Sequence, residues 1–234
     1  MGYTPGQVEG GRWKPLQYYM RRFIFRNHLI AASSDGRILV KSDDAFAPFS
    51  GTATVSLLHV DTGVVAPLAT YPVALPLGGG ATAWACANAT VDIARSTCPS
   101  WASLLPSAGC AADGSDCVVL LSLTDATGAL AADNFELLTP PYNMALPGAT
   151  VTFAIGAPAA DGSVPITLTT DKTALFVVLT TLAQGRFSDN AIHILPGATV
   201  VDFIPWGPLD AGLLKSSLRV EHIAQYPMNA TKGL

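Results

Sequence analysis

Carboxylates are the side chains with which this sequence could hydrolyse a glycosidic bond, and the chain has only three glutamates, Glu9, Glu136 and Glu221. Such hydrolysis normally needs two carboxyl groups flanking the bond, about 5–5.5 Å apart in retaining enzymes. Glu9 precedes the only predicted helix, Glu136 follows a predicted hairpin and Glu221 lies in the last predicted strand. Because nothing in this pattern brings two of them into one pocket, no catalytic residue is predicted.

Other catalytic patterns are also missing from the sequence. It contains no G-x-S-x-G elbow, no phosphate-binding glycine loop and no H-E-x-x-H pair. Ordinary structural roles are expected for the four scattered histidines, which are His28, His59, His193 and His222. We therefore predict no cofactor-binding residue, no metal-binding residue and no cofactor.

Four cysteines lie within one loop-like stretch: Cys86, Cys98, Cys110 and Cys117. They lack the C-x₂-C pair of a zinc knuckle, so disulfides are favoured over metal, and three pairings remain open. Disulfides, together with possible glycosylation at Asn88 and Asn229 in N-x-T sequons, indicate an oxidising compartment. We expect a lysosomal or secreted protein; reduced cysteines and a cytoplasmic protein are the alternative.

The composition indicates a folded protein, because half of the residues are apolar, only 13% are charged and the mean hydropathy is +0.38. A net charge of −4 gives no general attraction to phosphate backbones, which argues against a nucleic-acid partner. No apolar run approaches the roughly 20 residues of a membrane span, and the first residues lack the apolar core of a signal peptide.

The elements expected around these residues are one helix and two series of short strands. Trp13, Leu16, Met20 and Phe23 recur at three- and four-residue intervals, which predicts a helix over about 12–26. Alternating or β-branched runs separated by turn residues then predict antiparallel strands over 28–145 and again over 146–234. We expect an all-β fold of two immunoglobulin-like sandwiches, the first carrying an irregular cysteine-containing insertion over 76–115.

Two segments resemble the same family. Residues 11–23 (GRWKPLQYYMRRF) look like the G-[RK]-W-K-x-L-x-Y-x-x-x-x-F segment that closes the catalytic barrel of β-mannosidases in glycoside hydrolase family 2. Residues 185–190 (GRFSDN) are similar to the G-R-F-S-D-N signature of the last immunoglobulin-like domain of those enzymes. The resemblance covers nearly the whole chain and is weakest over 72–116.

The resemblance implies a division into three parts: the final helix of a (β/α)₈ barrel over 1–27, and the two sandwiches over 28–145 and 146–234. Both catalytic glutamates of such an enzyme would then lie upstream of Met1. The chain alone would be inactive, and it would support the upstream barrel that binds the glycan and removes terminal β-linked mannose. The apolar stripe of the helix would pack against that barrel.

Structural roles are expected for the motif residues Trp13, Arg186, Phe187, Asp189 and Asn190. Asp189 or Asn190 is expected to hold a turn, and Arg186 to pair with a carboxylate. The alternative function is a non-catalytic carbohydrate-binding or adhesive sandwich protein. That function would need a platform of exposed aromatic residues, for which the candidates are Trp84, Trp101, Tyr142 and Trp206.

Overall fold

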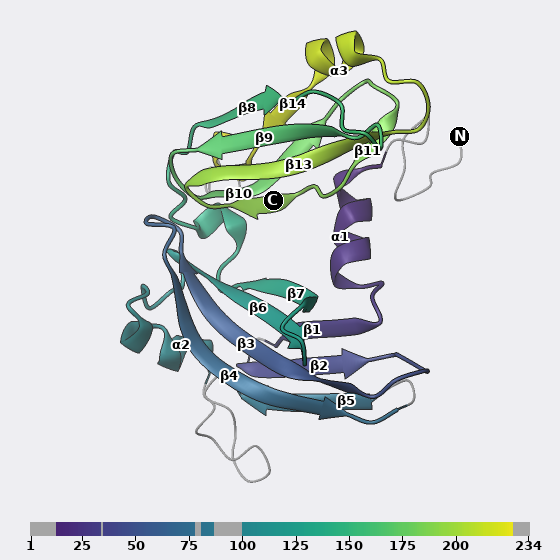
Figure 1. Ribbon diagram of the computed structural model, residues 1–234. Coiled ribbons are helices and arrows are strands. Elements are labelled where there is room, and N and C mark those ends of the chain that lie inside the picture. Colours follow the sequence, from purple (N-terminus) through teal and green to yellow (C-terminus); the bar gives the residue numbers. More distant parts are fainter. Residues whose placement is uncertain (1–12, 34, 78–80, 87–99, 227–234) are drawn as a thin grey trace, which may run out of the picture. The chain divides into compact units, whose positions relative to one another are not determined.

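A computed structural model describes residues 13–33, 35–77, 81–86 and 100–226, with the backbone only for 81–86 (Figure 1). These residues form two compact units. The first sandwich comprises the described residues of 22–60 and 64–145, and the second sandwich comprises 13–21, 61–63 and 146–226. Each contains two antiparallel sheets, which confirms the predicted all-β fold of two immunoglobulin-like sandwiches preceded by a helix.

The first sandwich consists of a sheet in the order β1-β2-β5 and a sheet in the order β4-β3-β6-β7. Short helical turns, α2, η2 and η3, lie in the connections. The bounds of these elements are β1 (His28–Ala32), β2 (Arg37–Ser42), β3 (Phe49–His59), β4 (Val65–Leu75), β5 (Ala81–Cys86), α2 (Trp101–Leu104), η2 (Pro106–Ala108), β6 (Cys117–Asp125), β7 (Leu130–Leu137) and η3 (Pro141–Asn143).

Strand β3 shows why these segments form a sandwich. Its alternate residues Ala53, Val55 and Leu57 are buried, whereas Thr54 and Ser56 between them are only half-buried. Alternation places the first set on the face of the sheet that is packed inside the unit. β3 pairs with β4 on one side and with β6 on the other, so it is a central strand of its sheet.

The predicted turn after β6 is confirmed. The Asp125 carboxylate accepts hydrogen bonds from the backbone N–H groups of Thr127 and Ala129, at 2.8 and 3.0 Å. Gly128 has φ +86°, a left-handed conformation that glycine adopts without steric cost. The turn joins β6 to β7 as an antiparallel hairpin.

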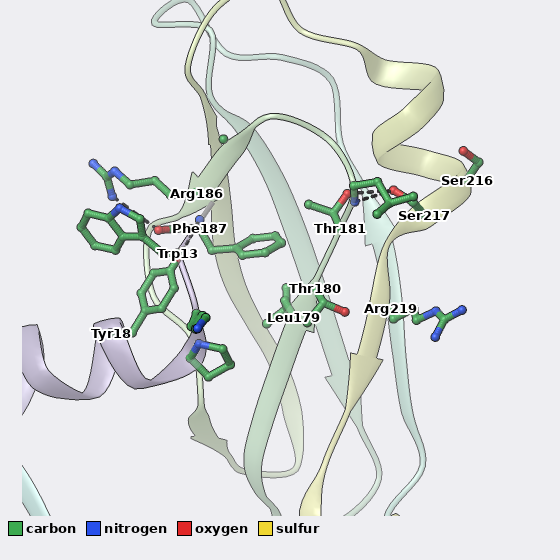
Figure 2. Close-up of a pocket in the computed structure, with 14 residues that line it drawn as sticks. Trp13, Tyr18, Leu179, Thr180, Thr181, Arg186, Phe187, Ser216, Ser217 and Arg219 are labelled. Atoms are coloured by element: carbon green, nitrogen blue, oxygen red, sulfur yellow. Dashed lines mark hydrogen bonds between the residues drawn. The ribbon is translucent and has the colours of Figure 1, made fainter. Parts of the chain in front are cut away.

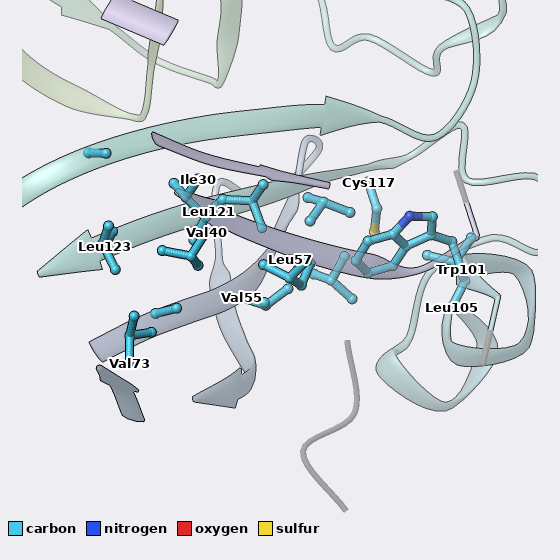
Figure 3. Packing of buried hydrophobic residues seen from close by; sticks show 14 of the residues in the cluster. Ile30, Val40, Val55, Leu57, Val73, Trp101, Leu105, Cys117, Leu121 and Leu123 are labelled. Carbon is cyan, nitrogen blue, oxygen red and sulfur yellow. The ribbon is translucent and has the colours of Figure 1, made fainter. Parts of the chain in front are cut away.

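The core of the first sandwich contains Trp101, which is 5% exposed (Figure 3). Its indole N–H donates to the Ser33 carbonyl oxygen at 2.9 Å, so the buried polar atom is satisfied. Leu57, Leu105 and Cys117 belong to the same cluster. Trp101 is therefore a core residue rather than part of an exposed aromatic platform.

The prediction of an irregular insertion over 76–115 was wrong in part. Residues 81–86 form β5, which pairs with β2 from Ser42↔Ala81 to Arg37↔Cys86, and 101–108 contain α2 and η2. The sequence ATAWAC of β5 is rich in small residues and lacks a β-branched run, so its own propensity is weak. Its strand conformation depends on the ladder that β2 offers.

The second sandwich consists of a sheet in the order β11-β13-β9-β8 and a sheet in the order β12-β10-β14. The strand predictions over 146–222 are confirmed, but β11 and α3 were missed because both are short. The bounds are β8 (Val151–Ile155), β9 (Val164–Thr170), β10 (Ala174–Thr180), β11 (Gly185–Phe187), β12 (Ile192–Ile194), β13 (Gly197–Pro205), α3 (Ala211–Ser217), β14 (Arg219–Glu221) and η4 (Ile223–Gln225).

The structure joins two of the four cysteines, Cys110 and Cys117, in a disulfide. Cys86 ends β5, where only the backbone is described. Cys98 and the two sequon residues, Asn88 and Asn229, lie outside the described residues. In the part of the chain that the structure describes, no helix is long and apolar enough to cross a bilayer.

Candidate functional site

A cavity of about 570 Å³ opens on the second sandwich (Figure 2). It is bordered by the N-terminal segment, by β11, by the end of β10 and by the junction of α3 and β14. Three of its lining residues are cations, several carry hydroxyl groups, and none is an aspartate or glutamate. The lining residues are Trp13, Lys14, Pro15, Tyr18, Leu179, Thr180, Thr181, Leu182, Gly185, Arg186, Phe187, Ser216, Ser217 and Arg219.

Arg186 stacks on two indole rings. Its guanidinium carbon lies 5.2 Å from the ring centroid of Trp13 and 5.8 Å from that of Trp206. Arg21 also lies over Trp13, at 5.6 Å. Cation–π contacts of this kind contribute roughly 0.5–2 kcal/mol each. Among the described contacts, Arg186 thus stacks on aromatic rings, and the predicted pairing with a carboxylate is not among them.

Tyr18 connects α1 (Pro15–Phe23) to β11. Its side chain is 3% exposed, and its hydroxyl oxygen accepts a hydrogen bond from the backbone N–H of Phe187 at 2.7 Å. The Trp13 ring lies edge-on to it, 5.3 Å away. Burial raises the pKa of Tyr18 to about 12, against the opposing effects of the Phe187 hydrogen bond and the Arg186 charge.

β11 can reach this position only because its first residue is glycine. A Cβ atom on Gly185 would clash with the Phe203 ring and lie 2.6 Å from the Ile204 carbonyl oxygen, both on the neighbouring β13. The close approach lets β11 pair with β13 and brings Phe187 against Phe203, with ring centroids 5.6 Å apart. Gly185 therefore has a packing role in the motif.

Asn190 fixes the segment that follows β11. Its side-chain oxygen accepts from the backbone N–H of Leu179 and of Ala191, at 2.8 and 2.9 Å, and its amide donates to the Leu179 carbonyl at 2.8 Å. Asp189 accepts from the Asn190 N–H at 2.8 Å. Asn190 is 3% exposed, so these bonds replace the water it has lost. Asn190 therefore holds the turn through Ala191 and also connects it to β10 through Leu179, which lines the cavity.

Hydroxyl groups form the opposite wall of the cavity. The Thr181 and Ser217 hydroxyls are 3.0 Å apart, and the Ser217 oxygen also accepts from the Leu182 N–H at 2.9 Å. Ser217 donates to the Leu213 carbonyl within α3 at 2.6 Å. α3 begins at an Asp210 cap, whose carboxylate accepts from the Leu213 N–H at 2.8 Å.

Three cations line this cavity, Lys14, Arg186 and Arg219, and their charge suits an anionic ligand. The described lining residues include no carboxylate of the kind that glycosidic hydrolysis needs. The two described glutamates are not among the lining residues: Glu136 is on β7 of the first sandwich, where burial raises its pKa, and Glu221 is on β14 of the second. Glu9 lies outside the described residues.

The predicted helix needs correction in part, because α1 is shorter than expected and Trp13 precedes it. Leu16 is 51% exposed, which is compatible with a stripe that packs against an upstream barrel, and Tyr18 is the buried residue of α1. Trp13 packs on Arg186 of this chain rather than being left open for another domain. The stripe was predicted from the three- and four-residue spacing of apolar residues alone. That criterion leaves out Tyr18, which is buried because its hydroxyl has a hydrogen-bond partner inside the unit.

The last residues of α1 belong to the first sandwich. Arg22 forms an ion pair with Asp133 on β7, and its Nε lies 3.0 Å from an Asp133 carboxylate oxygen. The Phe23 and Phe135 rings meet edge-on at 5.5 Å. Phe23 is therefore also packed on the chain itself.

Of the predicted motif residues, Trp13, Arg186 and Phe187 line the cavity, and Asp189 and Asn190 form the turn behind it. Sequence reasoning missed Tyr18, Ser217 and Arg219. Tyr18 was within reach, because it stands at the tyrosine of the G-[RK]-W-K-x-L-x-Y pattern. Ser217 and Arg219 carry no local signal, since α3 and β14 bring them there through the tertiary fold.

Three comparisons place these observations among known proteins. Residues 147–226 match the Ig_mannosidase family model, an Ig-fold domain. The β-D-mannosidase of Dictyoglomus thermophilum has a similar fold over 90% of this chain and 23% of its own, with 18% identity and a TM-score of 0.58. The exo-chitosanase CsxA of Amycolatopsis orientalis has a similar fold over 84% of this chain and 25% of its own, with 18% identity and a TM-score of 0.50.

Because the sequence identities are only 18%, these structural similarities show the fold alone. The chain spans about a quarter of the length of either of these two proteins. No curated protein sequence matches it significantly.

Proposed function

Since residues 147–226 are an Ig-fold domain of the mannosidase type, we propose that the chain is the C-terminal accessory part of an exo-β-mannosidase. Such an enzyme removes terminal β-linked mannose from glycans. Its catalytic glutamates belong to a barrel upstream in the same polypeptide, with residues 1–27 as the end of that barrel. Residues 28–145 and 146–234 are its two C-terminal domains.

One contact carries this proposal. Trp13 and Tyr18 belong to the segment that resembles the end of a β-mannosidase barrel, and Arg186 and Phe187 belong to the segment that resembles the last domain. The two segments touch: Arg186 stacks on Trp13, and the Phe187 N–H binds the Tyr18 hydroxyl. Two matches to one family that also form one packed site support a shared origin better than either match alone.

For the competing carbohydrate-binding function, the predicted aromatic residues whose side chains are described do not form one exposed platform. Trp101 is buried in the first core. Tyr142 and Trp206 are half-exposed but belong to different units, and Trp206 is stacked by Arg186. We also propose a lysosomal or extracellular location, because disulfides such as Cys110–Cys117 persist in oxidising compartments.

The test is hydrolysis of p-nitrophenyl β-D-mannoside by the purified chain and by the same chain extended upstream through the barrel. p-Nitrophenyl β-D-glucosaminide is assayed in parallel, because an exo-chitosanase shares the fold. We expect no turnover by the chain alone, since the described residues that line its cavity include no carboxylate, and turnover of the mannoside by the extended protein.

Each other outcome has a defined meaning. Turnover of only the glucosaminide by the extended protein would refute mannose specificity and leave the accessory role. Turnover by the chain alone would refute the accessory role, and Glu136→Gln and Glu221→Gln variants would then locate the carboxylate. An inactive but folded extended protein would count against the whole proposal.

A further inference from the structure

A second group of side chains, in the first sandwich, has the composition of a metal site. One nitrogen of His59 and the sulfur atoms of Cys110 and Cys117 all lie within 4.8 Å of one another. The His59 Nδ1 is 3.5 Å from the Cys117 sulfur. Zinc ligands held tetrahedrally at about 2.1 Å (N) and 2.3 Å (S) lie roughly 3.6 Å apart, so this spacing is already that of two ligands of one ion.

The backbone holds the three residues in place independently of the disulfide. His59 and Cys117 are cross-strand partners at the end of the β3–β6 ladder. The Cys110 N–H donates to the Leu105 carbonyl at 3.0 Å, and the Val60 N–H donates to the Asp116 carbonyl at 2.9 Å. These backbone contacts do not involve the S–S bond, so after reduction the two cysteine side chains only need to rotate apart to present two sulfur ligands beside the imidazole.

The loop between the cysteines has its own hydrogen bonds. The Asp116 carboxylate accepts from the Ala111 N–H at 2.8 Å, and the Gly114 N–H donates to the Ala111 carbonyl at 2.9 Å. Gly114 has φ +68°, and a Cβ there would lie 2.6 Å from Leu138. These contacts hold the backbone of the loop, whereas the Cys110 side chain can still rotate after reduction.

We propose that reduction of the Cys110–Cys117 disulfide creates a site for a thiophilic divalent cation such as Zn²⁺, bound by His59, Cys110 and Cys117. A dithiol reductant gives two electrons and two protons to the cysteine sulfurs and becomes a cyclic disulfide itself. The cation then displaces the two thiol protons and binds two thiolates and the His59 Nδ1. Three protein ligands leave one tetrahedral position for water.

The test uses Co²⁺, whose spectrum reports sulfur ligands and tetrahedral geometry. The chain carries Cys86→Ser and Cys98→Ser so that only the relevant thiols remain, and it is reduced with dithiothreitol and freed of reductant under anaerobic conditions. We expect one Co²⁺ per chain, a sulfur-to-cobalt charge-transfer band, intense visible bands and displacement by Zn²⁺. The same protein left oxidised is expected to show none of these bands.

A His59→Gln variant separates this site from nonspecific thiol binding. It is expected to keep the two thiols but bind Co²⁺ roughly tenfold or more weakly. Its far-UV circular dichroism in the oxidised form checks that it folds, and Cys110→Ser provides a second ligand deletion if it does not. Equal Co²⁺ affinity with and without His59, absence of the charge-transfer band, or loss of the native fold on reduction would each overturn the proposal.

Discussion

At the scale of single residues, two tyrosines with buried hydroxyl groups, Tyr18 and Tyr71, show how the same group can have opposite effects on stability. The Tyr18 oxygen accepts the Phe187 N–H at 2.7 Å, so it satisfies a buried donor. The Tyr71 hydroxyl on β4 is buried with no hydrogen-bond partner among the described residues. Removing a satisfied group leaves its partner unpaired, whereas removing an unsatisfied one relieves a desolvation cost.

This difference predicts opposite results for two identical substitutions. Tyr18→Phe leaves the Phe187 N–H without its acceptor and is expected to lower the free energy of unfolding of the second sandwich by about 1–3 kcal/mol. Tyr71→Phe is expected to leave the stability of the first sandwich unchanged or raised. Urea unfolding gives both values, and hydrogen exchange at the Phe187 amide gives a local reading. Equal losses for both variants would contradict the interpretation.

At the scale of elements, β11 and α3 are short pieces whose position depends on neighbours. β11 has three residues and is held by the ladder to β13 and by the Tyr18 hydroxyl. α3 has seven residues, begins at the Asp210 cap and presents Ser217 to the end of β10. These two elements form parts of the cavity wall, so the cavity depends on close backbone packing more than on strand propensity.

Gly185→Ala tests that dependence. The added Cβ would meet the Phe203 ring and the Ile204 carbonyl, so we expect a loss of about 1–3 kcal/mol in the stability of the second sandwich, from overpacking. Gly207→Ala is the matched control, because a Cβ there meets nothing within 4 Å and its φ is not in the left-handed region. Urea unfolding of both variants provides the measurement. A Gly185→Ala protein as stable as the control would show that β13 can move away.

At the scale of the whole molecule, each unit has its own apolar core and one tyrosine whose pKa burial raises to about 12. The folded state keeps these phenols neutral, whereas in the unfolded chain they ionise near pH 10. The ionisation of these groups therefore leaves stability unaffected below pH 10, and stability falls as the pH rises from 10 through about 12.

Both sandwiches are therefore expected to lose stability as the pH rises above 10. For Tyr18, which is almost fully buried, the loss between pH 10 and 12 is expected to be about 2 kcal/mol. Tyr18→Phe should flatten the pH dependence of the second sandwich, and Tyr71→Phe that of the first. Urea titrations at pH 9, 10, 11 and 12, followed by resolved methyl resonances of each unit, give the slopes. An unchanged slope in Tyr18→Phe would contradict the assignment.

The sequence by itself determined the fold class, because strand alternation and turn residues are local signals. The burial of Val55 and Leu57 and the Asp125–Gly128 turn follow from residue types within a few positions. It also located the motif at 185–190, but the role of Tyr18, which connects α1 to β11, was not predicted.

Only the tertiary structure decided what lies next to what. β5 needs the β2 ladder, Arg186 meets Trp13 across more than half of the chain, and His59 reaches Cys117 through the register of two strands. The spacing of the cysteines argued against a metal site, but a ligand from β3 completes a three-residue group that no local pattern contains. Such contacts depend on the closure of long loops and the register of sheets, which residue types alone do not fix.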